Sequence, residues 1–274
     1  MSLSKKYDFA VIFSVKNANP NGDPLNSNRP RITYEGLGEV SDVCIKRKIR
    51  DRILEKGIEI FVQSDDRKID DAKSLKARAE AAFGKNLGGQ DIAKSACEKW
   101  FDVRAFGQLF AFKSSKNDDS AGVSIGIRGP VTVQSAFSVQ PVNITSTQIT
   151  KSVSGEEGKD GKKSSDTMGM KHRVDDGIYV LYGSINPQLA EKTGFSDEDA
   201  KVIKQVLPKL FENDASSARP EGSMRVLNVF WWEHNCKSGQ YSSSKVHGSL
   251  VVNADGSYIL KNLDGLEPEI IPGF

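Results

Sequence analysis

The segment Lys46–Arg52 contains five basic residues and a single acid. On a helix these cations would lie on both flanks of a buried stripe, with Lys46 and Arg50 on one flank and Lys48 and Arg52 on the other. Such a helix suits a phosphate backbone, because each neutralised phosphate releases counterions. The alternative is an ordinary solvated helix face whose long side chains extend to water. The wheel geometry alone leaves both interpretations open.

The helix that carries these cations is predicted to begin at Ser41. The Ser41 hydroxyl can accept a hydrogen bond from a free backbone N–H, and Asp42 places a negative charge in the first turn. Ile45, Ile49 and Ile53 recur at a spacing of four. This pattern predicts a helix that is buried along one stripe.

Residues suited to catalysis or metal binding are scattered. The three histidines and three cysteines lie far apart in the sequence: His172, His234, His247, Cys44, Cys97 and Cys236. They form no HExxH motif, no triad-like neighbourhood and no CxxC pair, and the chain has no GxxxxGK[ST] loop. We therefore predict neither a catalytic site nor a metal or other cofactor.

Asp23 is the one acid that deserves a nuclease hypothesis. It lies in the stretch Asn17–Pro24, which is rich in Asn, Pro and Gly and predicts a loop. An exposed carboxylate there could serve a metal-assisted nuclease. We favour a local turn role for Asp23, because Asp side chains in such loops accept hydrogen bonds from nearby backbone groups.

A second group of residues suited to RNA ends the polar stretch 151–173, whose composition predicts an exposed loop. Met168 and Met170 stand in this stretch beside Lys171 and His172. Methionine adapts to irregular apolar surfaces, and nucleobases offer such faces. The alternative is that both methionines pack where the chain returns to a strand at Ile178.

The whole chain has 274 residues, 38% of them hydrophobic and 27% charged, with a formal net charge of +2. These values predict a soluble globular protein whose interaction with nucleic acid depends on the local distribution of Lys and Arg. An odd number of separated cysteines fits reduced thiols in the cytoplasm. No run approaches 18 consecutive apolar residues, so we expect no membrane partner.

Strands and helices alternate along the chain. Period-two patterns predict strands over 7–15, 123–139 (one long strand or a hairpin, with a bulge or edge at Gly129-Pro130), 178–185 and 226–232. Helical patterns follow Ser41 and cover 65–99 (broken at Gly88-Gly89), 100–112 and 197–211. This order predicts an α+β fold with helices on one face of an antiparallel sheet.

The strand aromatics, including Trp231 and Trp232, lie in apolar runs without interleaved basic residues. Sheet-based RNA recognition uses aromatics on an open face. We therefore predict that most of these rings belong to the core.

Several motifs occur in a fixed order along nearly the whole chain: Asn19–Pro24, Arg29–Ile32, Val40–Arg50, Phe101–Gly107, Arg128–Val131 and Met168–His172. Each motif is modest alone, but their ordered combination resembles the backbone subunit of type I-C CRISPR complexes, in the Cas-seven family. The resemblance implies a single domain over 1–274 with a modified RRM-like (ferredoxin-like) palm. It also implies a helical finger insertion at about 62–99 and a thumb-like insertion at about 140–173.

The resemblance further implies a non-catalytic, crRNA-binding subunit of an interference (Cascade) complex that supports RNA-guided recognition of foreign DNA. Its expected partners are CRISPR RNA, the target DNA strand paired to the guide, other copies of itself and other Cascade subunits. The residues expected to contact RNA are Arg29, Arg31, Lys46, Arg47, Arg50, Met168, Lys171 and His172. Two alternatives remain, a metal-dependent RNA endonuclease of the same fold that uses an acidic loop residue, and a scaffold without nucleic acid.

Overall fold

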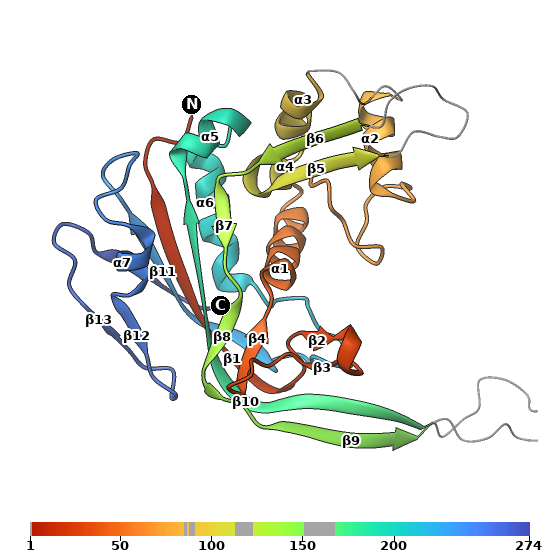
Figure 1. Ribbon diagram of the computed structural model, residues 1–274, viewed down its shortest axis with the longest axis vertical. Coiled ribbons are helices and arrows are strands. Elements are labelled where there is room, and N and C mark those ends of the chain that lie inside the picture. Colours follow the sequence, from red (N-terminus) through yellow and green to blue (C-terminus); the bar gives the residue numbers. More distant parts are fainter. Residues whose placement is uncertain (1, 85–86, 88–90, 113–122, 151–167) are drawn as a thin grey trace, which may run out of the picture.

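The structure is a computed structural model that describes residues 2–84, 87, 91–112, 123–150 and 168–274. Its main sheet contains β1 (Tyr7–Ala18), β4 (Leu37–Val40), β7 (Val131–Val133), β8 (Ala136–Pro141), β9 (Ile144–Thr150), β10 (Met168–Ile185), β11 (Met224–Glu233) and β14 (Pro268–Pro272). Neighbouring strands follow the order β14-β11-β1-β10-β8-β4, and β7 and β9 also pair with β10 (Figure 1).

Strand β1 lies in the middle of this sheet, antiparallel to β10 on one side and to β11 on the other. Phe9, Val11 and Phe13 face one core, whereas Ala10 and Ile12 face a second core. All five side chains are fully buried. The period-two pattern correctly predicted the strand, but it indicated one strongly apolar face and the structure buries both.

Two helices cover the first face of the sheet. They are α1 (Asp42–Glu55) and α6 (Asp197–Val206), and both contribute to the core that contains Phe9 and Phe13. The chain order β1, α1, β8, β10, α6, β11 is the β-α-β-β-α-β order of ferredoxin-like folds. The predicted α+β class is confirmed, while the RRM-like character of the palm stays a prediction.

A different layer covers the second face. It consists of α7 (Ser243–His247) and a hairpin of β12 (Leu250–Val252) and β13 (Tyr258–Leu260), seen at the left of Figure 1. Under this layer Phe230 and Trp232 are almost fully buried, and Trp231 is buried on the opposite face. The prediction that these rings belong to the core is confirmed. The helices are not restricted to one face, because α7 lies on the second.

A third cluster of buried residues lies beside the main sheet, in α2 (Leu75–Phe83), α3 (Ile92–Lys99), α4 (Phe101–Phe106) and the two-stranded sheet of β5 (Gly107–Phe112) and β6 (Val123–Arg128). The predicted helix over 100–112 is wrong after Phe106. Gly107 has φ +80°, and a Cβ there would lie 2.2 Å from the backbone oxygen of Ile127. This close approach ends the helix and begins β5.

The pattern over 123–139 is not one strand or hairpin. It is divided among β6, β7 and β8, and β6 pairs with β5 while β7 and β8 pair with β10. Gly129-Pro130 lies at the change from one sheet to the other, where Pro130 cannot donate to a ladder. The large apolar residues keep odd numbers through all three strands, so the sequence pattern could not show the break. The predicted single buried face is wrong in β8, where Ala136 and Ser138 are buried and Phe137 is 41% exposed.

The remaining elements are short. They include β2 (Gly22–Asp23), β3 (Arg29–Pro30) and α5 (Pro187–Thr193). The helix predicted over 197–211 ends at Val206, and a 3-10 turn over Leu207–Lys209 follows because Pro208 cannot continue the α-helical bonds. Helices α2 and α3 fall in the stretch predicted as an insertion, and the division into one domain with two insertions stays a prediction. Across the described residues, every helix is too short or too polar to span a bilayer.

Candidate nucleic-acid interface

Helix α1 begins as predicted. The Ser41 hydroxyl accepts a hydrogen bond from the Cys44 N–H at 3.3 Å. Asn21, in the turn-rich loop, accepts hydrogen bonds from the Ser41 N–H at 2.9 Å and from its hydroxyl at 2.8 Å. Ile49 and the rest of its stripe are fully buried against the sheet. The loop and the first turn of α1 are therefore held together, and the basic residues of α1 have a fixed frame.

Two of the five cations of α1 are enclosed. Lys48 forms an ion pair with Asp214, and its Nζ atom lies 5.5 Å from the centroid of the Phe211 ring. Arg52 pairs with Glu55 at 2.7 Å. Both basic side chains are buried, at 3% and 5% exposure. Neither is open to a phosphate in this structure.

Arg50 is held in a third buried pair. Its Nε donates to the Asp102 carboxylate at 2.8 Å, and its guanidinium lies 5.1 Å from the ring centroid of Phe106. Asp102 is 1% exposed and also accepts hydrogen bonds from the backbone N–H groups of Phe61 and Val62, at 2.6 Å and 3.0 Å. The pair joins α1 to α4 and to the chain that follows α1. Its geometry gives Arg50 a positioning role.

Lys46 and Arg47 remain half-exposed on α1. Lys46 lies 2.9 Å from Asp42, one helical turn earlier. Arg47 donates to the Val62 carbonyl at 3.3 Å and lies 3.4 Å from Asp51. Burial raises the pKa of Asp51, although Arg47 acts in the opposite direction. Since these are the cations of α1 with the most exposed side chains, they form its accessible basic face.

The turn-rich loop gives Asp23 the local role that we favoured. Its carboxylate accepts a hydrogen bond from the Leu25 N–H at 3.2 Å and caps a 3-10 turn over Pro24–Asn26. The Arg31 guanidinium lies 3.6 Å from the same carboxylate. Within the described ranges, no three His, Cys, Asp or Glu side chains are grouped so that they could hold a metal ion.

The second predicted group is not in a loop. Strand β10 begins at Met168, ten residues before the predicted start, and pairs with β9 so that Met168–Val174 lies opposite Ile144–Thr150. The two strands form an arm that projects from the sheet (Figure 1). The prediction of a loop is wrong for 168–173, because a partner strand orders a polar sequence that has little apolar patterning. The rest of the predicted loop, 151–167, lies outside the described residues.

The base of this arm contacts the turn-rich loop. Arg29 of β3 donates to the Ser146 hydroxyl of β9 at 2.9 Å, and that hydroxyl lies 2.8 Å from Nδ1 of His172 on β10. His172 is buried, and its Nε2 has no hydrogen-bond partner among the described residues. Two residues predicted from separate motifs, Arg29 and His172, are therefore brought together through Ser146.

Further along the arm, the predicted residues are open to solvent. Met168 and Met170 are 66% and 54% exposed, and Lys171 is also exposed. Successive side chains of a strand point to opposite faces, so Met168, Met170 and His172 of β10 lie on one face of the arm and Lys171 on the other. The methionines are not packed at the return to the strand, which was the alternative interpretation.

Three residues of this arrangement were missed as site residues: Asn21, Asp102 and Ser146. The first two lie within motifs that we recognised, but nothing in a linear motif shows that Asn21 accepts from Ser41 or that Asp102 accepts from Arg50. Ser146 lies in a stretch rich in Thr and Ile, which favours a strand. That signal could have located the arm, although not the contact with Arg29.

The turn-rich loop links both predicted groups. Asn21 binds the start of α1, and Arg29 binds the base of the arm. In Figure 1 the β2–β3 pair lies between α1 and the β9–β10 arm. Lys46, Arg47, Arg29 and Arg31 are thus carried by one connected frame.

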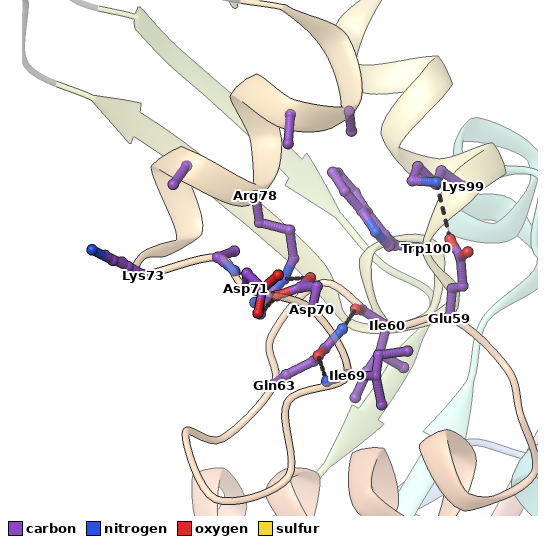
Figure 2. A pocket seen from close by; sticks show the side chains of 14 residues that line it. Glu59, Ile60, Gln63, Ile69, Asp70, Asp71, Lys73, Arg78, Lys99 and Trp100 are labelled. Atoms are coloured by element: carbon purple, nitrogen blue, oxygen red, sulfur yellow. Dashed lines mark hydrogen bonds and ion pairs between the residues drawn. The ribbon is translucent and has the colours of Figure 1, made fainter.

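A separate cavity of about 740 Å³ lies between α2 and the chain before it (Figure 2). Ile60, Ala77 and Trp100 contribute apolar surface, and the ion pairs Arg78–Asp70 (2.6 Å) and Lys99–Glu59 (3.1 Å) border it. None of the residues predicted to contact RNA lines this cavity. It is therefore distinct from the frame formed by α1, the loop and the arm.

Comparison with known proteins identifies the family. The family model described as "CRISPR-associated protein Cas7" matches residues 5–265, which is nearly the whole chain. The chain therefore belongs to the CRISPR-associated protein Cas7 family, and the resemblance seen in the ordered motifs is confirmed at this level.

Individual relatives are distant. A CRISPR-associated protein Cas7 from Haloferax volcanii is 24% identical over 289 residues, which covers 96% of this chain and 80% of the relative. A chain of a "CRISPR RNA-guided surveillance complex" superposes with a TM-score of 0.46 at 17% identity, covering 92% of this chain and 77% of its own. A chain of such a complex in a "pre-nicking" state has a TM-score of 0.46 at 13% identity, covering 83% and 78%.

The different environments of the α1 cations predict different costs of removal. Arg50→Ala leaves the buried Asp102 carboxylate without its cation, and we expect a loss of about 3–5 kcal/mol in the free energy of unfolding. Lys46→Ala removes a partly exposed pair with Asp42 and should cost about 0.5 kcal/mol or less. Urea denaturation of both variants measures the difference. Equal costs would show that the Arg50–Asp102 pair does not stabilise the fold.

Proposed function

We propose that this Cas7-family chain binds CRISPR RNA as a non-catalytic backbone subunit of an RNA-guided interference complex. The observation that carries the proposal is the family match over 5–265, combined with a connected frame that presents half-exposed cations. The proposed partners are CRISPR RNA, the DNA strand paired to it, further copies of the chain and other subunits. The ordered motifs favour the type I-C subtype, and the three free cysteines favour the cytoplasm.

The covered sheet determines how RNA would be held. Sheet-based RNA-binding domains stack bases on exposed strand aromatics. Here Phe230 and Trp232 are enclosed, so the proposed contacts come from α1, the turn-rich loop and the arm. Lys46, Arg47 and the arginines of the loop would bind phosphates, while Met168 and Met170 offer exposed apolar surface to bases.

Phosphate contacts suit a subunit that serves many guides, because they carry no sequence information. The residues Arg29, Arg31, Lys46, Arg47 and Lys171 are proposed as such contacts, with Arg50 as the residue that positions its neighbours and His172 as part of the arm's base. The nearly balanced formal charge of +2 is compatible with packing of several copies side by side, since no strong overall repulsion opposes it.

The role of α1 can be tested through the salt dependence of binding. Lys46→Gln/Arg47→Gln should weaken RNA affinity and reduce the slope of log affinity against log salt by about 1.4, since each single-strand phosphate contact contributes about 0.7. Filter binding with a repeat-containing RNA over a salt series measures both quantities.

The matched control is Lys245→Gln/Lys261→Gln, which removes the same charge from the layer on the second face of the sheet. It should leave the slope unchanged. An identical response of the two double variants would contradict a phosphate contact at α1. No binding by the unmodified chain would favour the scaffold alternative.

The endonuclease alternative depends on Asp23. Its carboxylate is occupied by the turn and by Arg31, so a catalytic metal would have to displace these contacts. We expect purified protein to leave labelled repeat RNA and target RNA intact with or without magnesium, as gel electrophoresis would show. Magnesium-dependent cleavage that is lost in Asp23→Ala would contradict the non-catalytic proposal.

A further inference from the structure

A buried polar cluster lies beneath α7, on the sheet face that the proposed RNA interface does not use. Asp8 of β1 is fully buried, and its Oδ2 accepts a hydrogen bond from Nε2 of His234 at 2.8 Å. The ammonium group of Lys6 lies 3.2 Å from the same oxygen. His247 of α7 donates from Nε2 to the Gly183 carbonyl at 3.1 Å and lies 3.6 Å from Oδ1 of Asp8.

These contacts join the sheet to the segment 234–266, which we call the C-terminal cover. Within the cover, the Gln240 N–H donates to Nδ1 of His234 at 2.9 Å, so His234 carries its proton on Nε2, toward Asp8. Lys6 also donates to the Tyr241 carbonyl at 3.1 Å. The cluster thus contains side chains from the sheet side (Asp8 and Lys6) and from the C-terminal cover (His234 and His247).

In the part of the chain that the structure describes, the C-terminal cover forms no strand ladder with the main sheet. Its two strands, β12 and β13, pair with each other. In the sequence, the cover follows β11 and precedes β14, and both of these strands pair within the main sheet. It is held by side-chain packing, by the buried cluster and, at its beginning, by backbone hydrogen bonds from the Lys6 N–H to Cys236 (3.2 Å) and from the His234 N–H to Lys6 (3.0 Å). The part beyond these bonds can therefore separate without breaking the ladders of β11 and β14.

Within this cluster, His247 is the side chain whose protonated form is disfavoured by burial. It faces Asp8 of β1, Lys6 just before that strand, and Gly183 of β10. The Tyr182 ring of β10 stacks on it, with the ring centroids 4.9 Å apart. Burial lowers the pKa of His247, and the charge of Lys6 acts in the same direction, against Asp8 and the bond to Gly183. A second proton would place a cation in this enclosed position.

We propose that His247 and its neighbours form a proton-sensitive latch, which holds the C-terminal cover on the sheet at neutral pH and releases it in mildly acidic solution. Because the folded pKa is lowered, the stabilisation is fully present above the ordinary value of about 6.5. It is lost as the pH falls from there toward the folded value, since the released histidine binds a proton that the latched one does not.

Asp8 contributes in a separate, more acidic range. Burial alone would raise its pKa, but hydrogen bonds from His234 and Ser243 and the charges of Lys6 and His247 outweigh it and lower the pKa. Its contribution is therefore present above the ordinary value of about 3.9 and is lost below it. The release that we propose in mildly acidic solution is assigned to His247, and the contribution of Asp8 is lost at lower pH.

Hydrogen exchange of the full chain tests the latch. The protection factors of the amides in 243–260, relative to those of β1 and β10, should fall as the pH is lowered from about 8 to 5, by at most tenfold per pH unit for one proton. His247→Gln keeps an amide donor for Gly183 but does not titrate, so the relative protection should no longer depend on pH. His172→Gln, a buried histidine outside the cluster, should retain the dependence.

A wild-type cover whose relative protection is constant over this range would overturn the proposal, whatever the variants do. So would a His247→Gln variant with the same pH dependence as the wild type. The latch does not rest on RNA binding, because neither the cover nor the cluster contains a proposed RNA contact. Filter binding at neutral pH, unchanged in His247→Gln, keeps the two proposals distinguishable.

Discussion

The burial of β1 on both faces is the constraint on which the rest of the structure depends. Its odd and even residues enter two separate cores, so α1 and α6 must cover one side of the sheet and the C-terminal cover the other. This arrangement removes the aromatic sheet face from the surface. Under the proposed function, the nucleic-acid contacts would come from the margins of the sheet, where α1, the turn-rich loop and the β9–β10 arm are linked by Asn21, Arg29 and Ser146.

The packing of α1 also determines which of its basic residues are enclosed. A helix packed by one narrow stripe brings its flanking residues close to neighbouring elements, and a buried cation needs an acidic partner there. Lys48, Arg50 and Arg52 therefore pair with Asp214, Asp102 and Glu55. The cations of α1 with the most exposed side chains are Lys46 and Arg47. A segment with five cations thus presents a much smaller accessible basic face than its composition indicates.

The sequence was informative where a local pattern has one physical cause. The isoleucine spacing and the Ser41 cap located α1, and alternation located β1 and β11. It was misleading where tertiary contacts decide: Gly107 ends α4 because the backbone near Ile127 approaches it, and β10 extends back to Met168 because β9 pairs with it. For the site, the order of the motifs along the chain predicted the correct protein family. The separation of Lys46 and Arg47 from their buried neighbours required the positions of Asp102 and Asp214, which are distant in sequence.

Native mass spectrometry of the protein, purified together with the nucleic acid that accompanies it, tests most directly whether this chain assembles on RNA as proposed. We predict species that contain several 30.0 kDa chains on one RNA and that dissociate after ribonuclease treatment but not after deoxyribonuclease treatment. A single chain free of nucleic acid, or an assembly unchanged by ribonuclease, would contradict it.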